Sequence, residues 1–323
     1  MMDINDKSGI AVSIIVVSYN TREMTLECLR SILKETKSHR FEVVVLDNMS
    51  TDGSFAAIEN EFGSDPRFVL IESHENLGFA GGNNLAAKEA SGDFLLLLNP
   101  DTVVLDRALD ALVDFAIEKP EHRIWGGRTL FADGSLNPYS CWGSYTLWSI
   151  FTANAGLRKL FPKSALCNPR AMVSWKRDSV REVAIVTGCL FLIDRPLWDE
   201  LQGFDPEFFM YGEEADLCMR AHAVGAQPII TPDSTITHYA GASENIRVDK
   251  LARLLDAEVR LFRRNMSPFA FKCALWMTKS GVALRATALW CLRKLGIRKS
   301  ESVWGILWNR RSEWSSGSVK NMQ

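Results

Sequence analysis

The chain has 323 residues, 47% of them hydrophobic, which is enough for one large domain or two smaller ones. Its first ten residues carry acids and no apolar core, so they do not form a signal peptide, and no uncharged apolar stretch reaches the roughly 18 residues of a membrane-spanning helix. Seven scattered cysteines without a CxxC pair exclude a disulfide framework or a zinc site and predict reduced thiols in a cytosolic protein.

The net charge of −2 conceals two regions of opposite charge. Up to residue 259 there are 24 basic and 37 acidic residues, whereas residues 260–311 contain 12 basic residues and one acid. Half of the ten tryptophans also lie in the C-terminal region, at positions 276, 290, 304, 308 and 314. This distribution predicts a second surface that meets an anionic partner.

The first hundred residues alternate between apolar runs and segments of helical spacing. The expected order is a strand at 11–20, a helix at 21–35, a strand at 41–48, a helix near 55–62, a strand at 67–73, a helix at 80–90 and a strand at 92–98. Such alternation is typical of a parallel, doubly wound α/β sheet.

Polar side chains follow three of these strands. Asn20, Asp47 and Asp101 each stand just past a carboxyl end, where open α/β sheets bind their ligands, so we expect them at one rim. Any one of them could equally be a turn or cap residue.

The pattern becomes less regular after residue 120. Residues 133–164 are aromatic and aperiodic and predict irregular structure, and 181–195 predicts a long strand interrupted at Thr187-Gly188. A short helix at 196–203, a helix at 212–226 that begins at its acids, and an extended segment at 228–243 should follow.

Several of these segments suit a particular chemistry. Asp101, fixed behind Pro100, suits Mg²⁺ or Mn²⁺ on a diphosphate, and Asp47 could accept a hydrogen bond from a nucleobase imide or a ribose hydroxyl. The glycines of "NLGFAGGNN" (76–84) precede a helix whose N–H groups suit a phosphate or sugar oxygen, although they form neither a Walker loop nor GxGxxG. Close packing would explain the same glycines.

The acids of "FMYGEEADLCMR" (209–220) have two readings. Glu213, Glu214 and Asp216 favour the start of a helix, where Asp216 can pair with Arg220, but a crowded carboxylate with a raised pKa also suits a general base. His238 is either a structural histidine or a ligand for a metal or phosphate.

Taken together, the motifs "VSIIVVSYN", "VVVLDNMSTDGS", "NLGFAGGNN", "LLLLNPDTVV", "FMYGEEADLCMR" and "ITHYAGAS" resemble those of family-two glycosyltransferases, in the same order. The nearest branch is the bacterial rhamnosyltransferase-like group, which builds O-antigen, capsule and cell-wall linker polysaccharides. The resemblance spans about residues 10–245. It implies a GT-A fold and an inverting, metal-dependent hexosyltransferase with a nucleotide-diphosphate sugar donor. It further favours rhamnose from dTDP-rhamnose and a glycan or polyprenyl-linked acceptor.

The resemblance also implies roles for individual positions. By this resemblance, the residues that contact the nucleoside are Tyr19, Asn20, Asp47, Asn48 and Asp52. The residues that line the donor pocket are Gly78, Phe79, Gly82 and Asn83. Asp101 and His238 would bind the cation, Mg²⁺ or Mn²⁺. Glu214 would be the catalytic base, with Glu213 and Asp216 as alternatives. Two positions depart from the family pattern: Asn99 replaces the first Asp of the metal motif, and Glu214 stands where Asp is commoner.

We therefore expect a catalytic domain at 1–245, with a nucleotide-sugar half (10–120) and an acceptor and base half (121–245), and a basic, Trp-rich helical region at 246–323. Residues 267–299 predict a basic helix that lies on an anionic membrane at the inner face of the cytoplasmic membrane, or else packs internally or in a homodimer. We expect no nucleic-acid partner. The alternatives are a sugar-phosphate nucleotidyltransferase, which would want a Gly-rich basic loop where "SYNTRE" stands, and a non-catalytic sugar-nucleotide-binding protein.

Overall fold

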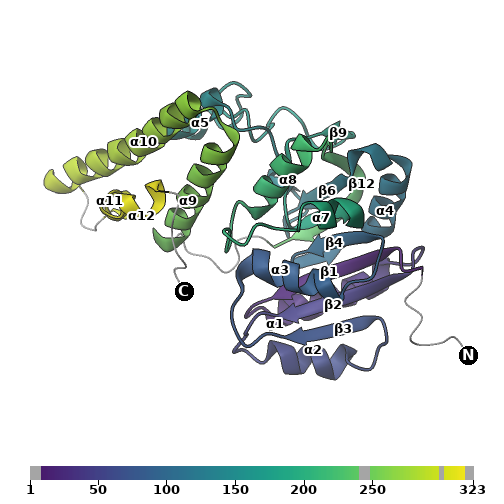
Figure 1. Cartoon of the computed structure of the whole chain (residues 1–323). Helices are drawn as coiled ribbons and strands as arrows, with labels where there is room; N and C mark the ends of the chain where they lie inside the picture. Colours follow the sequence, from purple (N-terminus) through teal and green to yellow (C-terminus); the bar gives the residue numbers. More distant parts are fainter. Residues whose placement is uncertain (1–8, 240–247, 298–301, 317–323) are drawn as a thin grey trace, which may run out of the picture. The chain divides into compact units, whose positions relative to one another are not determined.

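The computed structural model describes residues 9–239, 248–297 and 302–316. The chain forms two compact units, which we name the sheet unit (1–142 and 176–240) and the helical unit (143–175 and 241–323). Each is considered by itself, and Figure 1 shows the elements of both.

The sheet unit is built on one mixed sheet with the strand order β3-β2-β1-β4-β11-β6-β12-β5. The first four strands run parallel, as expected, while β11 is antiparallel to both β4 and β6. The strands on this path are β1 (Val12–Ser18), β2 (Phe41–Asp47), β3 (Phe68–Glu72), β4 (Phe94–Leu98), β5 (Thr102–Val104), β6 (Ile124–Leu130), β11 (Leu190–Asp194) and β12 (Ile229–His238).

Short strands and six helices complete the sheet unit. The two-residue strands are β7 (Leu136–Asn137), β8 (Cys141–Trp142), β9 (Arg181–Glu182) and β10 (Ile185–Val186). The helices are α1 (Arg22–Glu35), α2 (Ser54–Phe62), α3 (Gly78–Glu89), α4 (Ala108–Glu118), α7 (Arg195–Glu200) and α8 (Glu213–Ala223).

One apolar cluster lies on one face of the sheet. Alternate residues of β1, such as Ile14, pack in one cluster with Leu29 of α1, Ile58 of α2 and Leu112 of α4. The opposite face receives α3, where a Cβ at Gly82 would come 2.9 Å from Cγ1 of Val17. Because β1, β2 and β4 are buried on both faces, their sequences read as nearly continuous apolar runs.

The helical unit contains α5 (Leu147–Asn154), α6 (Leu157–Leu160), α9 (Val248–Asn265), α10 (Pro268–Lys294), α11 (Val303–Asn309) and α12 (Arg311–Ser315). Two small apolar clusters lie among its described residues. One joins Ile150, Phe262 and Ala274, and the other is centred on Val282 and Trp314.

The structure divides the chain differently from the expected boundary at 245. Residues 143–175 cluster with the C-terminal helices, because Ile150 of α5 packs on α9 and α10 and because Arg285 of α10 donates to the Ala153 carbonyl at 2.9 Å. Residues 241–245 lie outside the described residues.

Two expectations about secondary structure are wrong in detail. Irregular structure was expected at 133–164, yet a capping box between Thr146 and Ser149 starts α5 there. The long strand expected at 181–195 is divided into β9, β10 and β11, and the break at Thr187-Gly188 lies between the last two.

Candidate active site

Asp101 and His238 meet at the rim of the sheet because of one strand pairing. After β4 ends, the chain turns through Asn99 and Pro100 into β5, which pairs antiparallel with β12 and sets Thr102 opposite His238. The neighbouring Asp101 therefore lies beside the imidazole, with Oδ1 at 3.2 Å from Nε2. The pair joins two segments that are 137 positions apart in sequence.

The pair suits a divalent cation that also binds a phosphate ligand. Among the described residues, no group of three or more His, Cys, Asp or Glu side chains has an arrangement that could hold a metal. Mg²⁺ and Mn²⁺, however, need only one or two protein ligands when substrate phosphates and water supply the others. Asp101 and His238 therefore fit a cation that shares a diphosphate and do not fit a closed structural site.

His238 is electrostatically coupled to its neighbours. Burial by itself lowers the pKa of the imidazole, but Cys189 and Asp101 outweigh burial and raise that pKa to about 10. Because only a neutral imidazole ligates, a cation bound here would displace a proton from His238.

Two loops at the ends of β1 and β2 are tied together. Asn20 adopts a left-handed conformation with φ of 52°, and its Oδ1 accepts the Thr51 N–H at 2.8 Å. Its own N–H donates to Oγ of Ser50 at 2.9 Å, and Asp52 accepts the Arg22 N–H at 3.0 Å. Asn20 and Asp52 therefore shape the rim by bonding the two loops to each other.

Asp47 presents an unsatisfied acceptor at this rim. Its side chain is 2% exposed, Oδ1 accepts the Ser50 N–H at 2.8 Å, and Oδ2 is buried without a hydrogen-bond partner in the described chain. A buried carboxylate oxygen without a donor is costly, so an N–H or O–H from a ligand would relieve it. Tyr19, which follows β1 and is 44% exposed, offers an aromatic surface near the same loops.

Asn48 is buried and is occupied by protein contacts. Its Nδ2 donates to the Gly78 carbonyl at 3.1 Å, and its Oδ1 accepts the Leu77 N–H at 2.8 Å. Asn48 thus fixes the turn into α3.

Gly78 and Phe79 connect the start of α3 with two other segments. Gly78 has a φ of 69°, and a Cβ there would collide with the Phe209 carbonyl, which accepts the Phe79 N–H at 2.9 Å. A Cβ at Gly188 would come 2.9 Å from the Phe79 ring. Only glycine permits either approach, so the start of α3, the turn before β11 and the loop before α8 form one rigid junction.

Gly82 and Asn83 contribute from within α3. Gly82 allows α3 to lie close to β1, and Asn83, which is 1% exposed, donates to the Phe79 carbonyl at 2.9 Å. Both therefore stabilise the position of α3 through packing.

Sequence reasoning missed Asn84. Its Nδ2 donates to the Phe204 carbonyl at 2.8 Å, and its Oδ1 accepts the Phe204 N–H at 2.9 Å. The contact could not be predicted from the motif "GGNN", because the Phe204 backbone that Asn84 binds lies 120 positions later in the sequence. The same loop is held by Arg220, which donates to the carbonyls of Leu201 and Gly203.

The three acids of α8 differ sharply in environment. Tyr211 and Gly212 both have positive φ, which turns the chain so that the acids occupy the first helical turn. Asp216 is 2% exposed and accepts a charge-assisted hydrogen bond from Nε of Arg220 at 2.7 Å. Asp216 thus orients the arginine that anchors the preceding loop.

Glu213 and Glu214 form the remaining acidic pair. Glu213 is buried, its Oε2 has no hydrogen-bond partner among the described residues, and burial together with Glu214 raises its pKa well above the ordinary value. Glu214 is only half-buried. The two acids of this pair therefore differ, because Glu213 is enclosed by the protein and Glu214 is partly open to solvent.

A chain of contacts joins these groups across the rim. Asn99, two residues before Asp101, donates its N–H to the Cys189 carbonyl at 3.3 Å, and Gly188 lies against Phe79. The Phe79 N–H in turn donates to the Phe209 carbonyl, in the loop that leads to the acids of α8. The Asp101–His238 pair, the start of α3 and the acids of α8 are therefore connected by contacts within one unit.

Comparison with known proteins identifies the family to which the sequence is similar. Residues 13–183 match Glycosyl transferase family 2. The O-antigen biosynthesis protein RfbC of Myxococcus xanthus is 30% identical over 234 residues, which are 72% of this chain and 17% of that protein. The N-acetylglucosaminyl-diphospho-decaprenol L-rhamnosyltransferase of Mycobacterium tuberculosis is 26% identical over 218 residues, which are 62% of this chain and 67% of that protein.

The fold has counterparts among solved structures. The mannosyltransferase PcManGT from Pyrobaculum calidifontis, in complex with GDP-Man and Mn²⁺, matches with a TM-score of 0.56 at 19% identity, over 97% of this chain and 87% of that one. The likeness confirms the expected GT-A fold. Separately, no helix in the described ranges is both long and apolar enough to cross a membrane.

Proposed function

The chain belongs to glycosyl transferase family 2, and from that premise we propose that it moves a sugar from a nucleotide-diphosphate donor to an acceptor hydroxyl with inversion. The observation that carries the proposal is the Asp101–His238 pair at the same rim as the unsatisfied Asp47. One group suits a metal-bound diphosphate and the other suits the hydrogen-bond donors of a nucleoside.

In this proposal the nucleoside lies against the loops that follow β1 and β2. Oδ2 of Asp47 accepts a hydrogen bond from the base or the ribose, and Tyr19 packs against the nucleoside. Asp101 and His238 hold Mg²⁺ or Mn²⁺, which neutralises charge on the leaving diphosphate when it is bound. Gly78 and Phe79 position the turn at which the sugar lies.

Glu214 is our choice for the base that removes the proton from the acceptor hydroxyl. It is half-buried at the start of α8, whereas Glu213 is buried and Asp216 is engaged by Arg220. Direct attack on the anomeric carbon expels the nucleoside diphosphate and requires no enzyme nucleophile, so a correctly placed carboxylate suffices.

For the donor and the acceptor we propose dTDP-rhamnose and a glycan or polyprenyl-linked acceptor in bacterial surface glycan synthesis. The support is the similarity to proteins named for O-antigen biosynthesis and for rhamnosyl transfer to a diphospho-decaprenol. We further propose that the helical unit attaches the protein peripherally to the inner face of the cytoplasmic membrane, where such an acceptor would be reached.

Calorimetric titration of the full chain with dTDP, UDP and GDP, with and without Mn²⁺, tests the proposal. We expect one nucleotide to bind tightly only with the metal and to lose at least about tenfold in affinity in Asp101→Asn, because one metal ligand is weakened. Asp199→Asn, which alters an exposed carboxylate of α7, is the matched control and should bind as the parent does.

Binding that ignores both the metal and Asp101 would refute the proposed site. Product analysis then separates the reaction classes, since a transferase releases a nucleoside diphosphate and a nucleotidyltransferase would release pyrophosphate.

A further inference from the structure

The C-terminal end of α10 is an exposed apolar surface in the helical unit. Trp290 is 58% exposed, and Leu295 and Ile297, which follow the helix, are more than two-thirds exposed. Arg293 and Lys294 stand among them, and both are exposed. Large apolar side chains interleaved with cations are typical of segments that lie in the interface of an anionic membrane.

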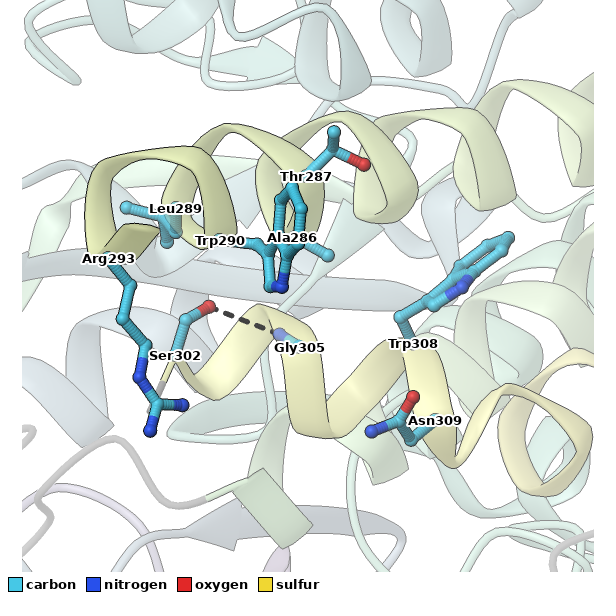
Figure 2. A pocket seen from close by; sticks show the side chains of 9 residues that line it. All are labelled: Ala286, Thr287, Leu289, Trp290, Arg293, Ser302, Gly305, Trp308 and Asn309. Carbon is cyan, nitrogen blue, oxygen red and sulfur yellow. Dashed lines mark hydrogen bonds between the residues drawn. The ribbon is translucent and has the colours of Figure 1, made fainter. Parts of the chain in front are cut away.

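A cavity of about 260 Å³ lies directly beside this surface, between α10 and α11. Trp290 and Arg293 project into it from α10, and Trp308 and Asn309 line it from α11 (Figure 2). A cavity of this volume has room for a phosphate group.

The lining is positive. None of its nine residues carries a carboxylate, and within the described chain no ion pair or hydrogen bond engages the Arg293 side chain. By contrast, Arg310 nearby in sequence is engaged by Asp249 at 2.6 Å and Glu313 at 2.7 Å. Arg293 is therefore the lining cation available to an anion.

Two of the tryptophan rings that line the cavity make cation–π contacts with basic side chains. Nζ of Lys294 lies 5.6 Å from the Trp290 ring, and the guanidinium of Arg311 lies 4.8 Å from the Trp308 ring. These contacts place two further cations beside rings that line the cavity.

We propose that this cavity binds the phosphate headgroup of an anionic phospholipid, with Arg293 on the phosphate and the apolar side chains beyond Trp290 among the acyl chains. The inference rests on the proposed peripheral attachment and specifies how that attachment is made. The apolar surface beside the cavity is what favours a membrane lipid, because free phosphate would use only the cation.

The test is flotation of the full chain with vesicles of phosphatidylcholine, alone or with phosphatidylglycerol. We expect binding only to the anionic vesicles, weakened about tenfold or more by Arg293→Gln and by Trp290→Ala, since each removes one half of the site. The matched control is Lys279→Gln, which removes one charge from the same helix outside the cavity and should cost less than about twofold.

Soluble probes identify the source of the phosphate. Dihexanoyl phosphatidylglycerol should bind the parent protein and lose affinity in Arg293→Gln, whereas inorganic phosphate should bind at least about tenfold more weakly than this lipid. Circular dichroism establishes that each variant is folded.

Equal losses in Arg293→Gln and Lys279→Gln would overturn the cavity site and leave only diffuse charge attraction. Failure of the parent to bind anionic vesicles would overturn both the cavity site and the peripheral attachment, while metal-dependent nucleotide binding would still support the transferase. Concentration-dependent dimerisation that Trp290→Ala abolishes, without vesicle binding, would assign the surface to a second copy of the chain.

Discussion

All seven residues of β1 are buried, whereas four of the 27 residues of α10 are. The sheet unit encloses its apolar side chains between the sheet and the helices on its two faces, and one cluster packs α1, α2 and α4 against the same face. The helical unit has two small clusters and leaves tryptophans such as Trp276, 68% exposed, on its surface.

The difference shows how each unit relates to its surroundings. A sheet that is covered on both faces places its unsatisfied polar groups, such as Oδ2 of Asp47, at the rim for a small ligand. In a helix whose exposed face combines tryptophan with lysine, the backbone polar groups are hydrogen-bonded within the helix, while the apolar side chains remain exposed to solvent. Such a face suits an extended partner. We therefore assign chemistry to the sheet unit and attachment to the helical unit.

The sharpest test of this division substitutes one acid in each unit. Glu214→Gln should lower kcat by about 10²–10⁴-fold and leave nucleotide affinity unchanged, because only proton removal is lost. Glu258→Gln is the counterpart in the helical unit. Burial raises the pKa of Glu258 against the opposing effects of Arg170 and Arg158.

Steady-state rates and titrations of both variants decide the outcome. Glu258→Gln should leave kcat within about twofold of the parent value. Comparable losses in both variants would contradict the division of labour between the units.

A second test uses two Asp–Arg pairs of the same spacing. Asp216 meets Arg220 at 2.7 Å in the sheet unit, and Asp256 meets Arg260 at 2.8 Å in the helical unit, with both carboxylates nearly buried. Replacing Asp256 by Ala should cost about 3–5 kcal/mol of stability, because the Arg260 side chain is only 9% exposed, whereas Asp216→Ala should cost less, because the Arg220 side chain is 29% exposed.

Denaturant unfolding measures that cost, and activity distinguishes the pairs. Arg220 also anchors the loop before α8, so Asp216→Ala should reduce turnover in protein that is still folded. Asp256→Ala should not. If Asp256→Ala reduced turnover of folded protein equally, the helical unit would have a direct part in the reaction.

The smallest expected effect concerns Glu213 and pH. Its raised pKa means that the folded protein keeps a proton which the unfolded chain releases near the ordinary glutamate pKa. Stability should therefore fall as pH rises from that value through the raised pKa. Glu213→Gln removes this penalty, so its melting temperature should exceed that of the parent at neutral pH and equal it near pH 4.

Melting curves across that pH range measure the effect, at about 2–4 °C for each kcal/mol recovered in a chain of this size. Asp199→Asn, in an exposed position of the same unit, should leave the pH profile as it is in the parent. A lower melting temperature of Glu213→Gln at neutral pH would show that the ionised form is the one the fold stabilises.

Much of the fold was readable from local patterns. The strands and helices up to β4 lie within a few residues of their expected ranges, because continuous apolar runs and helical spacing report burial directly. The placement of Asp47 and Asp101 after parallel strands also followed from the pattern. The assignment of residues 143–175 to the helical unit could not be predicted from the pattern, because it depends on a partner helix more than 100 positions away.

The sequence by itself determined the alternating sheet, the motifs at its rim and the separation of an acidic body from a basic tail. Those features are local and need only residue type and spacing. Tertiary structure decided which polar groups have partners: His238 beside Asp101, Asn84 on the Phe204 backbone, Asp216 on Arg220, and Glu213 without a partner for Oε2 among the described residues. Each outcome depends on the pairing of distant segments and on burial, and neither is encoded in local spacing.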